Sequence, residues 1–147
     1  EQLFKVMNLN EVEIKKEEKN ETGYVVDMIA TLLHSRSQAH IFHWQTKSQS
    51  SFSEHKALQK YYEGIVELID GIVESYQGMS GLIEYKAVKG IDNDVDKDNI
   101  ISYFEDLVKF VHTERMKDGL KEVSFIQNEI DNVEKLIYST LYKLRNL

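Results

Sequence analysis

The sequence predicts an all-α protein, a four-helix bundle with a long crossover between its second and third helices. Apolar residues recur every three or four positions over four long segments, which is the spacing of an amphipathic helix. The 147 residues include no proline, an absence that long helices tolerate well. One long irregular stretch, rich in glycine and aspartate, separates the second segment from the third. A connection of that length implies a crossover along the bundle.

The four helices are expected at residues 23–47, 52–77, 99–117 and 120–145. A polar, serine-rich stretch connects the first two, and Ser51 and Glu54 there match a capping box that satisfies free backbone N–H groups. Asp118 and Gly119 break the chain between the last two helices. Residues 1–21 are mixed and charged, so we expect an N-terminal extension followed by one bundle domain over residues 22–147.

The irregular stretch between the second and third helices covers residues 78–98. A short helix is expected within it at residues 82–88. The stretch is acidic, but the central glycine and the bidentate glutamate of a calcium-binding loop are missing. We therefore expect a solvated stretch that caps a helix and is formed by Asp92, Asp94, Asp96 and Asp98.

Composition narrows the class of protein. The net charge of −7 disfavours nucleic-acid binding, which depends on neutralising phosphates, and suits the attraction of cations. The absence of cysteine excludes disulfides, thiolate metal sites and cysteine nucleophiles. No apolar run approaches the roughly 20 residues that span a bilayer, and no signal-peptide pattern opens the chain. We expect a soluble, cytoplasmic protein with no membrane partner.

Four side chains are candidate metal ligands: His43, His55, Asp70 and Glu74. Imidazole and carboxylate groups suit iron, manganese or zinc. His55 and Asp70 are 15 residues apart, about 22 Å along one helix at 1.5 Å per residue. One chain therefore cannot bring the histidines and the carboxylates to one ion. Two chains can, if the second helix packs antiparallel on its symmetry mate, and a two-fold axis then creates two identical sites.

These residues resemble a known signature. His43-Trp44, His55, Asp70 and Glu74 match without a gap the pattern H-W-x10-H-x14-D-x3-E of the Dps family, the mini-ferritins named as DNA-binding proteins from starved cells. The resemblance is specific over residues 40–77. It implies a ferritin-like bundle with ligands shared across a dimer interface, in twelve-subunit hollow shells. It also implies a ferroxidase that oxidises Fe²⁺ with peroxide or oxygen, stores the iron and protects against oxidation. The E-x-x-H motif of ordinary ferritins is absent.

The chain departs from the family pattern at Gln59, where many members carry an acidic residue four positions after the second histidine. Glutamine is a neutral and weaker ligand, so the departure weakens the binding site for a second iron. Glu63, one helical turn further on, is a candidate replacement ligand. Trp44 is interpreted either as a packing residue or, beside a peroxide-consuming iron, as an interceptor of radicals. The other notable side chains are interpreted as interface, surface or packing residues, and they are His34, His40, Tyr61, Tyr62 and His112. The acidic residues of the fourth helix are interpreted either as the lining of an entry pore in a shell or as a solvated helix face, and they are Glu129, Asp131 and Glu134.

Two functional hypotheses remain open. In the first, the protein is a ferroxidase and iron store whose metal ligands are His43 and His55 of one chain with Asp70 and Glu74 of another. In the second, it is a ferritin-like helical module, structural or metal-binding, without oxidase activity. Gln59 keeps the second hypothesis open.

Overall fold

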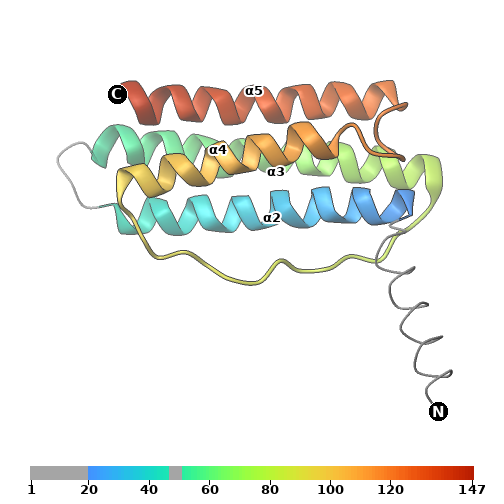
Figure 1. The fold of residues 1–147 in the computed structure, drawn as a ribbon, viewed down its shortest axis with the longest axis horizontal. Coiled ribbons are helices and arrows are strands. Elements are labelled where there is room, and N and C mark those ends of the chain that lie inside the picture. Colours follow the sequence, from blue (N-terminus) through green and yellow to red (C-terminus); the bar gives the residue numbers. More distant parts are fainter. Residues whose placement is uncertain (1–19, 47–50) are drawn as a thin grey trace, which may run out of the picture.

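The computed structural model describes residues 20–46 and 51–147 of the chain. Within these residues there is no β-strand, and the helices are α2 (Glu21–Gln45), α3 (Ser51–Ser80), α4 (Lys97–Glu114) and α5 (Ser124–Asn146). They lie side by side as a four-helix bundle (Figure 1). α3 packs against α2 and α5, and α4 packs against α5 and α2. The predicted all-α class and the order of the four helices are confirmed.

The helix ends differ from the predicted ones by a few residues. α2 begins at Glu21 because the Asn20 side chain caps it, accepting a hydrogen bond of 2.9 Å from the Gly23 N–H. α4 ends at Glu114, and turns occupy the chain up to α5. Gly119 lies in these turns with φ +89°, and a Cβ atom there would lie 2.9 Å from the Glu21 carbonyl oxygen. Only glycine fits this position without strain.

The core lies along the bundle axis and receives side chains from every helix. In α5, apolar residues recur at steps of three or four positions, so they form one stripe that faces the core and is buried. The same periodicity predicted this helix from the sequence. α3 contributes a matching stripe, which includes the fully buried Tyr61. The Tyr61 hydroxyl lies 2.6 Å from the Ser35 hydroxyl, and burial raises the pKa of Tyr61 far above its usual value. Tyr61 is therefore a core residue, as interpreted from the sequence.

Residues 81–96 connect α3 to α4 without helix or strand, so the short helix predicted at residues 82–88 is wrong. Figure 1 shows this connection passing alongside α2. Long-range bonds hold it there. The buried Gln38 amide donates to the Asp92 carbonyl oxygen at 2.8 Å and accepts from the Asp92 N–H at 2.8 Å. A Lys86–Asp27 ion pair adds a second attachment.

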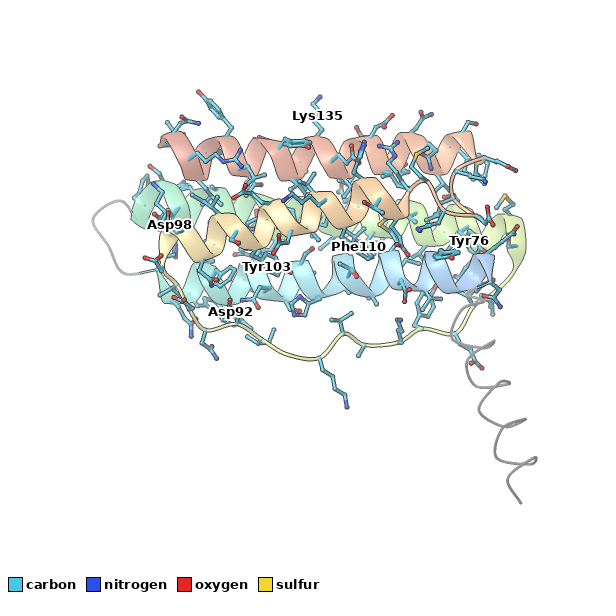
Figure 2. All side chains as sticks on the ribbon, in the orientation of Figure 1. Tyr76, Asp92, Asp98, Tyr103, Phe110 and Lys135 are labelled. Atoms are coloured by element: carbon cyan, nitrogen blue, oxygen red, sulfur yellow. The ribbon has the colours of Figure 1, made fainter. Side chains whose placement is uncertain are left out.

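The aspartates of this connection form turns instead of a helix cap. The Asp92 carboxylate accepts from the Asp94 N–H at 2.9 Å, and the Asp94 carboxylate accepts from the Asp96 N–H at 3.1 Å. Asn99 also donates to Asp92, and these bonds lower the pKa of Asp92 (Figure 2 labels this residue beside α2). The predicted solvated stretch is confirmed, since all four aspartates are exposed. Asp96 occupies the N-cap position of α4 without a side-chain capping bond.

None of the described helices has the length and apolar character needed to cross a membrane. The predicted extension over residues 1–21 falls almost entirely outside the described residues, and so does the Ser51 side chain of the predicted capping box. Its other member, Glu54, is buried and lies 3.9 Å from Lys97.

Candidate metal centre

His43 and His55 meet where α2 ends and α3 begins. His43 lies in the last turn of α2 and is 8% exposed, and His55 lies in the second turn of α3 and is partly buried. Their rings stack with centroids 3.5 Å apart and planes 22° apart. The two histidines that the sequence indicated as ligands are therefore in contact in one chain, because the helices that carry them are antiparallel neighbours.

A backbone hydrogen bond sets the tautomer of His43. The Nδ1 atom lies 2.8 Å from the carbonyl oxygen of His55, and a carbonyl can only accept, so Nδ1 carries the proton. In the neutral ring, Nε2 then holds the free lone pair. Burial, followed by repulsion from His55 and His40, lowers the pKa of His43, although the bond to His55 opposes this shift. A neutral imidazole with an oriented second nitrogen is the form that binds metals.

The stacked rings alone do not form a metal site. Each imidazole presents its lone pair in the plane of its ring, so two stacked rings direct their lone pairs side by side. An ion bound by both requires one ring to turn. Within the described ranges, 20–46 and 51–147, no group of three or more histidine, cysteine, aspartate or glutamate side chains is arranged to hold a metal ion.

Asp70 and Glu74, the predicted carboxylate ligands, lie further along α3. Both are exposed, and neither forms an ion pair or hydrogen bond with another described residue. They are four residues apart and share one helix face. About 22 Å of helix separates Asp70 from His55. The structure therefore brings the histidines together and leaves the carboxylates apart from them.

His55, Gln59, Asp70 and Glu74 follow one outward-facing side of α3, beside the face that carries the core. Gln59 replaces the acidic residue of the family pattern, and its amide donates to a Glu63 carboxylate oxygen at 3.0 Å. This bond places a carboxylate one turn from the position that lacks one. The same bond pairs the Glu63 carboxylate with the uncharged amide of Gln59.

An aromatic cluster that the sequence did not indicate adjoins the histidine pair. His40 stacks on Tyr62 with centroids 4.0 Å apart, and its ring centroid is 4.1 Å from that of Trp44. Tyr62 also meets the edge of His43, with centroids 5.3 Å apart. Tyr62 is seven residues after His55, so both lie on the same helix face. This spacing is the feature of the sequence that could have indicated the cluster. Trp44 is 67% exposed, so it is not a core packing residue within one chain.

The remaining histidines have structural partners. His34 lies 2.9 Å from the Tyr103 hydroxyl and 2.5 Å from the Gly90 carbonyl oxygen, so it attaches α4 and the 81–96 connection to α2. Figure 2 shows Tyr103 on α4 facing α2. His112 lies 3.0 Å from Glu134, a carboxylate partner on α5 that sequence spacing could not indicate.

The acidic residues of α5 are also engaged. Arg115 lies 2.6 Å from Asp131 and 3.3 Å from Glu134. Glu129 packs against α3 at Gly71, where an added Cβ atom would lie 3.0 Å from its carboxylate. These contacts agree with the interpretation of these residues as part of a helix surface.

A protein-family model matches residues 43–144, and the chain therefore belongs to that family, a family of unknown function (DUF5856). The matched range begins at His43 and covers all of α3, α4 and most of α5. No curated protein and no solved structure matches the chain.

Proposed function

We propose that this protein is a Dps-like ferroxidase and iron store, with a ferritin-like bundle and crossover, that assembles through the outer face of α2 and α3. The observation that carries the proposal is the separation within α3. A neutral, oriented His43 contacts His55 at one end, and two unengaged carboxylates, Asp70 and Glu74, lie about 22 Å away. An antiparallel second copy brings each end of α3 to the opposite end of its mate and forms two complete sites.

Charge and exposure support this arrangement. Two carboxylates and two imidazoles match the ligand preference of ferrous iron, and the carboxylates favour Fe³⁺ once an electron leaves. Exposed Trp44 and partly buried His40 lie on the face that a second copy would cover. Exposed aromatic side chains of this kind are enriched at protein interfaces. The twelve-subunit shell and the cytoplasmic location belong to the same proposal.

The reaction needs iron as a substrate and a peroxide or oxygen molecule as the oxidant. Two ferrous ions each lose one electron, and hydrogen peroxide accepts both as its O–O bond breaks and two hydroxide ions form. Hydrolysis of the ferric ions then releases protons and yields mineral. The protein contributes Nε2 of His43 as a metal ligand, and the His55 carbonyl oxygen orients this ring through its bond to Nδ1. The carboxylates hold the cation.

The second candidate function is a ferritin-like helical module without oxidase activity. The Gln59–Glu63 bond favours it, because a neutral amide occupies the position of an expected carboxylate. Ferrous iron that binds with no oxidation would support this alternative.

The experiment is anaerobic loading with Fe²⁺ followed by hydrogen peroxide, read as ferric absorbance, for the wild type, His43→Ala and Asp70→Ala. His112→Ala and Asp106→Ala serve as matched controls, because both replace exposed residues of α4 outside the site. We expect rapid oxidation in the wild type and in both controls. Wild-type absorbance that rises no faster than in His43→Ala would contradict the proposal.

A further inference from the structure

An open groove of about 760 Å³ lies between the first half of α3 and the last turns of α5. Gly64 of α3 lines it, and a Cβ atom added there would lie 3.4 Å from the Leu136 side chain of α5. Ala57, which is also small and buried, lines the groove seven residues before Gly64 on α3. These small residues leave the space between the two helices unfilled.

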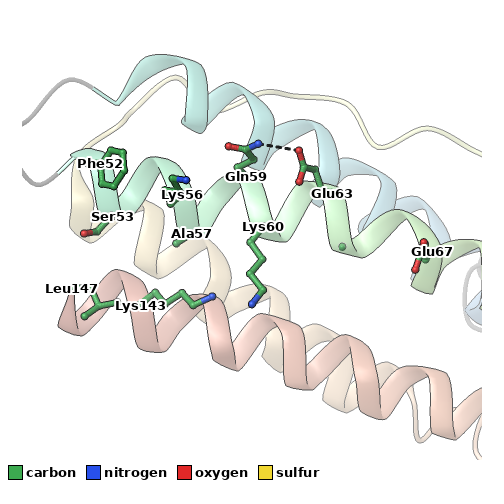
Figure 3. Close-up of a pocket in the computed structure, with 11 residues that line it drawn as sticks. Phe52, Ser53, Lys56, Ala57, Gln59, Lys60, Glu63, Glu67, Lys143 and Leu147 are labelled. Atoms are coloured by element: carbon green, nitrogen blue, oxygen red, sulfur yellow. Dashed lines mark hydrogen bonds between the residues drawn. The ribbon is translucent and has the colours of Figure 1, made fainter.

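Two lysines extend into this groove from opposite walls. Figure 3 shows Lys60 of α3 and Lys143 of α5 directed toward each other. Burial, followed by repulsion from Lys60, lowers the pKa of Lys143. Like charges repel, so an anion between them would be stabilised by both.

No described carboxylate forms an ion pair with either lysine, although Glu63 and Glu67 line the same groove. Lys60 and Lys143 belong to none of the ion pairs formed within residues 20–46 and 51–147. The nearest groove carboxylate along α3, Glu63, accepts its hydrogen bond from Gln59 instead (Figure 3).

The two ends of the groove differ in charge, although Ser53 and Lys56 line the end that carries Phe52, and the Lys56 ammonium lies 5.5 Å from the centre of the Phe52 ring. Toward the start of α3 and the end of α5 the groove is bordered by Phe52, 71% exposed, and Leu147, 61% exposed. On the other side it is bordered by Glu67, a carboxylate that disfavours a second anion. Phe52 and Lys60 are eight residues apart, about 12 Å along the helix. The groove therefore places the lysine pair next to a stretch where exposed apolar side chains adjoin one further cation, Lys56.

We propose that this groove binds a single-chain amphiphilic carboxylate. Its head group lies between Lys60 and Lys143, and its alkyl chain extends along Ala57 toward Phe52 and Leu147. The carboxylate neutralises both ammonium groups, and the alkyl chain covers exposed apolar surface. This site uses none of His43, His55, Asp70 and Glu74, although Gln59 and Glu63 line both the groove and the outer face of α3.

The test is isothermal titration calorimetry of the full chain with decanoate below its micelle concentration. Two further probes separate the head from the tail: butyrate keeps the carboxylate with little tail, and decyltrimethylammonium keeps the tail with a positive head. We expect saturable binding of decanoate, at least tenfold weaker binding of butyrate, and no saturable binding of the cation. Equal binding of decanoate and decyltrimethylammonium would overturn the proposal, since the lysines would then have no role.

Variants locate the site. Lys60→Gln and Lys143→Gln should each weaken decanoate binding about tenfold, which corresponds to about 1.4 kcal/mol. Lys135→Gln removes the same charge from α5 at a residue that Figure 2 shows directed away from the bundle, and it should bind decanoate as the wild type does. Phe52→Ala should weaken decanoate and leave butyrate unchanged. Decanoate affinity that is the same in Lys60→Gln, Lys143→Gln and the wild type would show that the carboxylate does not bind here.

Discussion

The two ends of the outer face of α3 differ in how far a single chain fixes them. At the His55 end, ring stacking, the backbone bond of His43 and burial define positions and protonation. At the Asp70 and Glu74 end, the carboxylates are exposed and have no described partner. Half of the proposed site is therefore organised by folding, and the other half depends on assembly. Changes at the two ends should consequently have different effects on stability and on iron chemistry.

The largest effect is expected from His43→Ala. Loss of a metal ligand should slow iron oxidation by at least about 100-fold, since even loss of a residue that only orients a ligand costs about 10–100-fold. The same change removes buried ring contacts and a hydrogen bond, so the free energy of unfolding should fall by about 1–3 kcal/mol. Ferric absorbance and urea unfolding measure the two effects. His112→Ala, which lies outside the site, should leave the oxidation rate unchanged.

Asp70→Ala and Glu74→Ala should separate the two effects. Each should slow iron oxidation by about 10–100-fold, while the free energy of unfolding stays within about 0.5 kcal/mol of the wild type because both side chains are exposed. The measurements are the same, with Asp106→Ala as the control. A large loss of stability in Asp70→Ala would mean that this end is organised within one chain after all.

A smaller effect concerns pH and tests the histidine end in the metal-free protein. Because the folded-state pKa of His43 lies below the ordinary value of 6.5, the unfolded chain binds the proton more readily. Stability from this group is therefore complete above pH 6.5 and falls as the pH drops from 6.5 toward the folded-state pKa. Urea unfolding of the wild type and of His43→Gln on both sides of this pH should show the weaker pH dependence in the variant. Identical pH profiles would contradict the burial of a neutral ring.

The smallest effect is expected at Gln59, between the two ends. Gln59→Asp adds the carboxylate that the family pattern expects and releases Glu63 from its hydrogen bond. Anaerobic titration should then show more Fe²⁺ bound per chain, with little change in stability, since Gln59 is only partly buried. Unchanged iron stoichiometry would mean that this position lies outside the metal centre.

Local periodicity was enough to predict the four helices. The apolar stripes of α3 and α5 repeat without interruption, so both helices follow from the sequence within a few residues. The short helix expected at residues 82–88 was wrong because contacts distant in sequence decide that segment. Gln38 bonds Asp92 from 54 positions away, and His34 bonds Gly90 from 56. No local pattern contains such contacts.

The candidate site was predictable in part for a related reason. His43 and His55 flank one short connection between antiparallel helices, so their spacing brings them together. The packing of Tyr62 on His40 depends on side-chain directions across two helices, which spacing alone does not determine. In the proposed site, the histidines meet Asp70 and Glu74 through a second copy, which the fold of one chain does not include.

The most direct test of the shared site is complementation between two inactive chains. One chain carries His43→Ala, the other carries Asp70→Ala with Glu74→Ala, and two different affinity tags allow purification of the mixed oligomer. A mixed two-fold dimer has one site with both intact halves, so iron oxidation should recover to as much as half of the wild-type rate. Mixed oligomers no more active than either parent would contradict a site built from two chains.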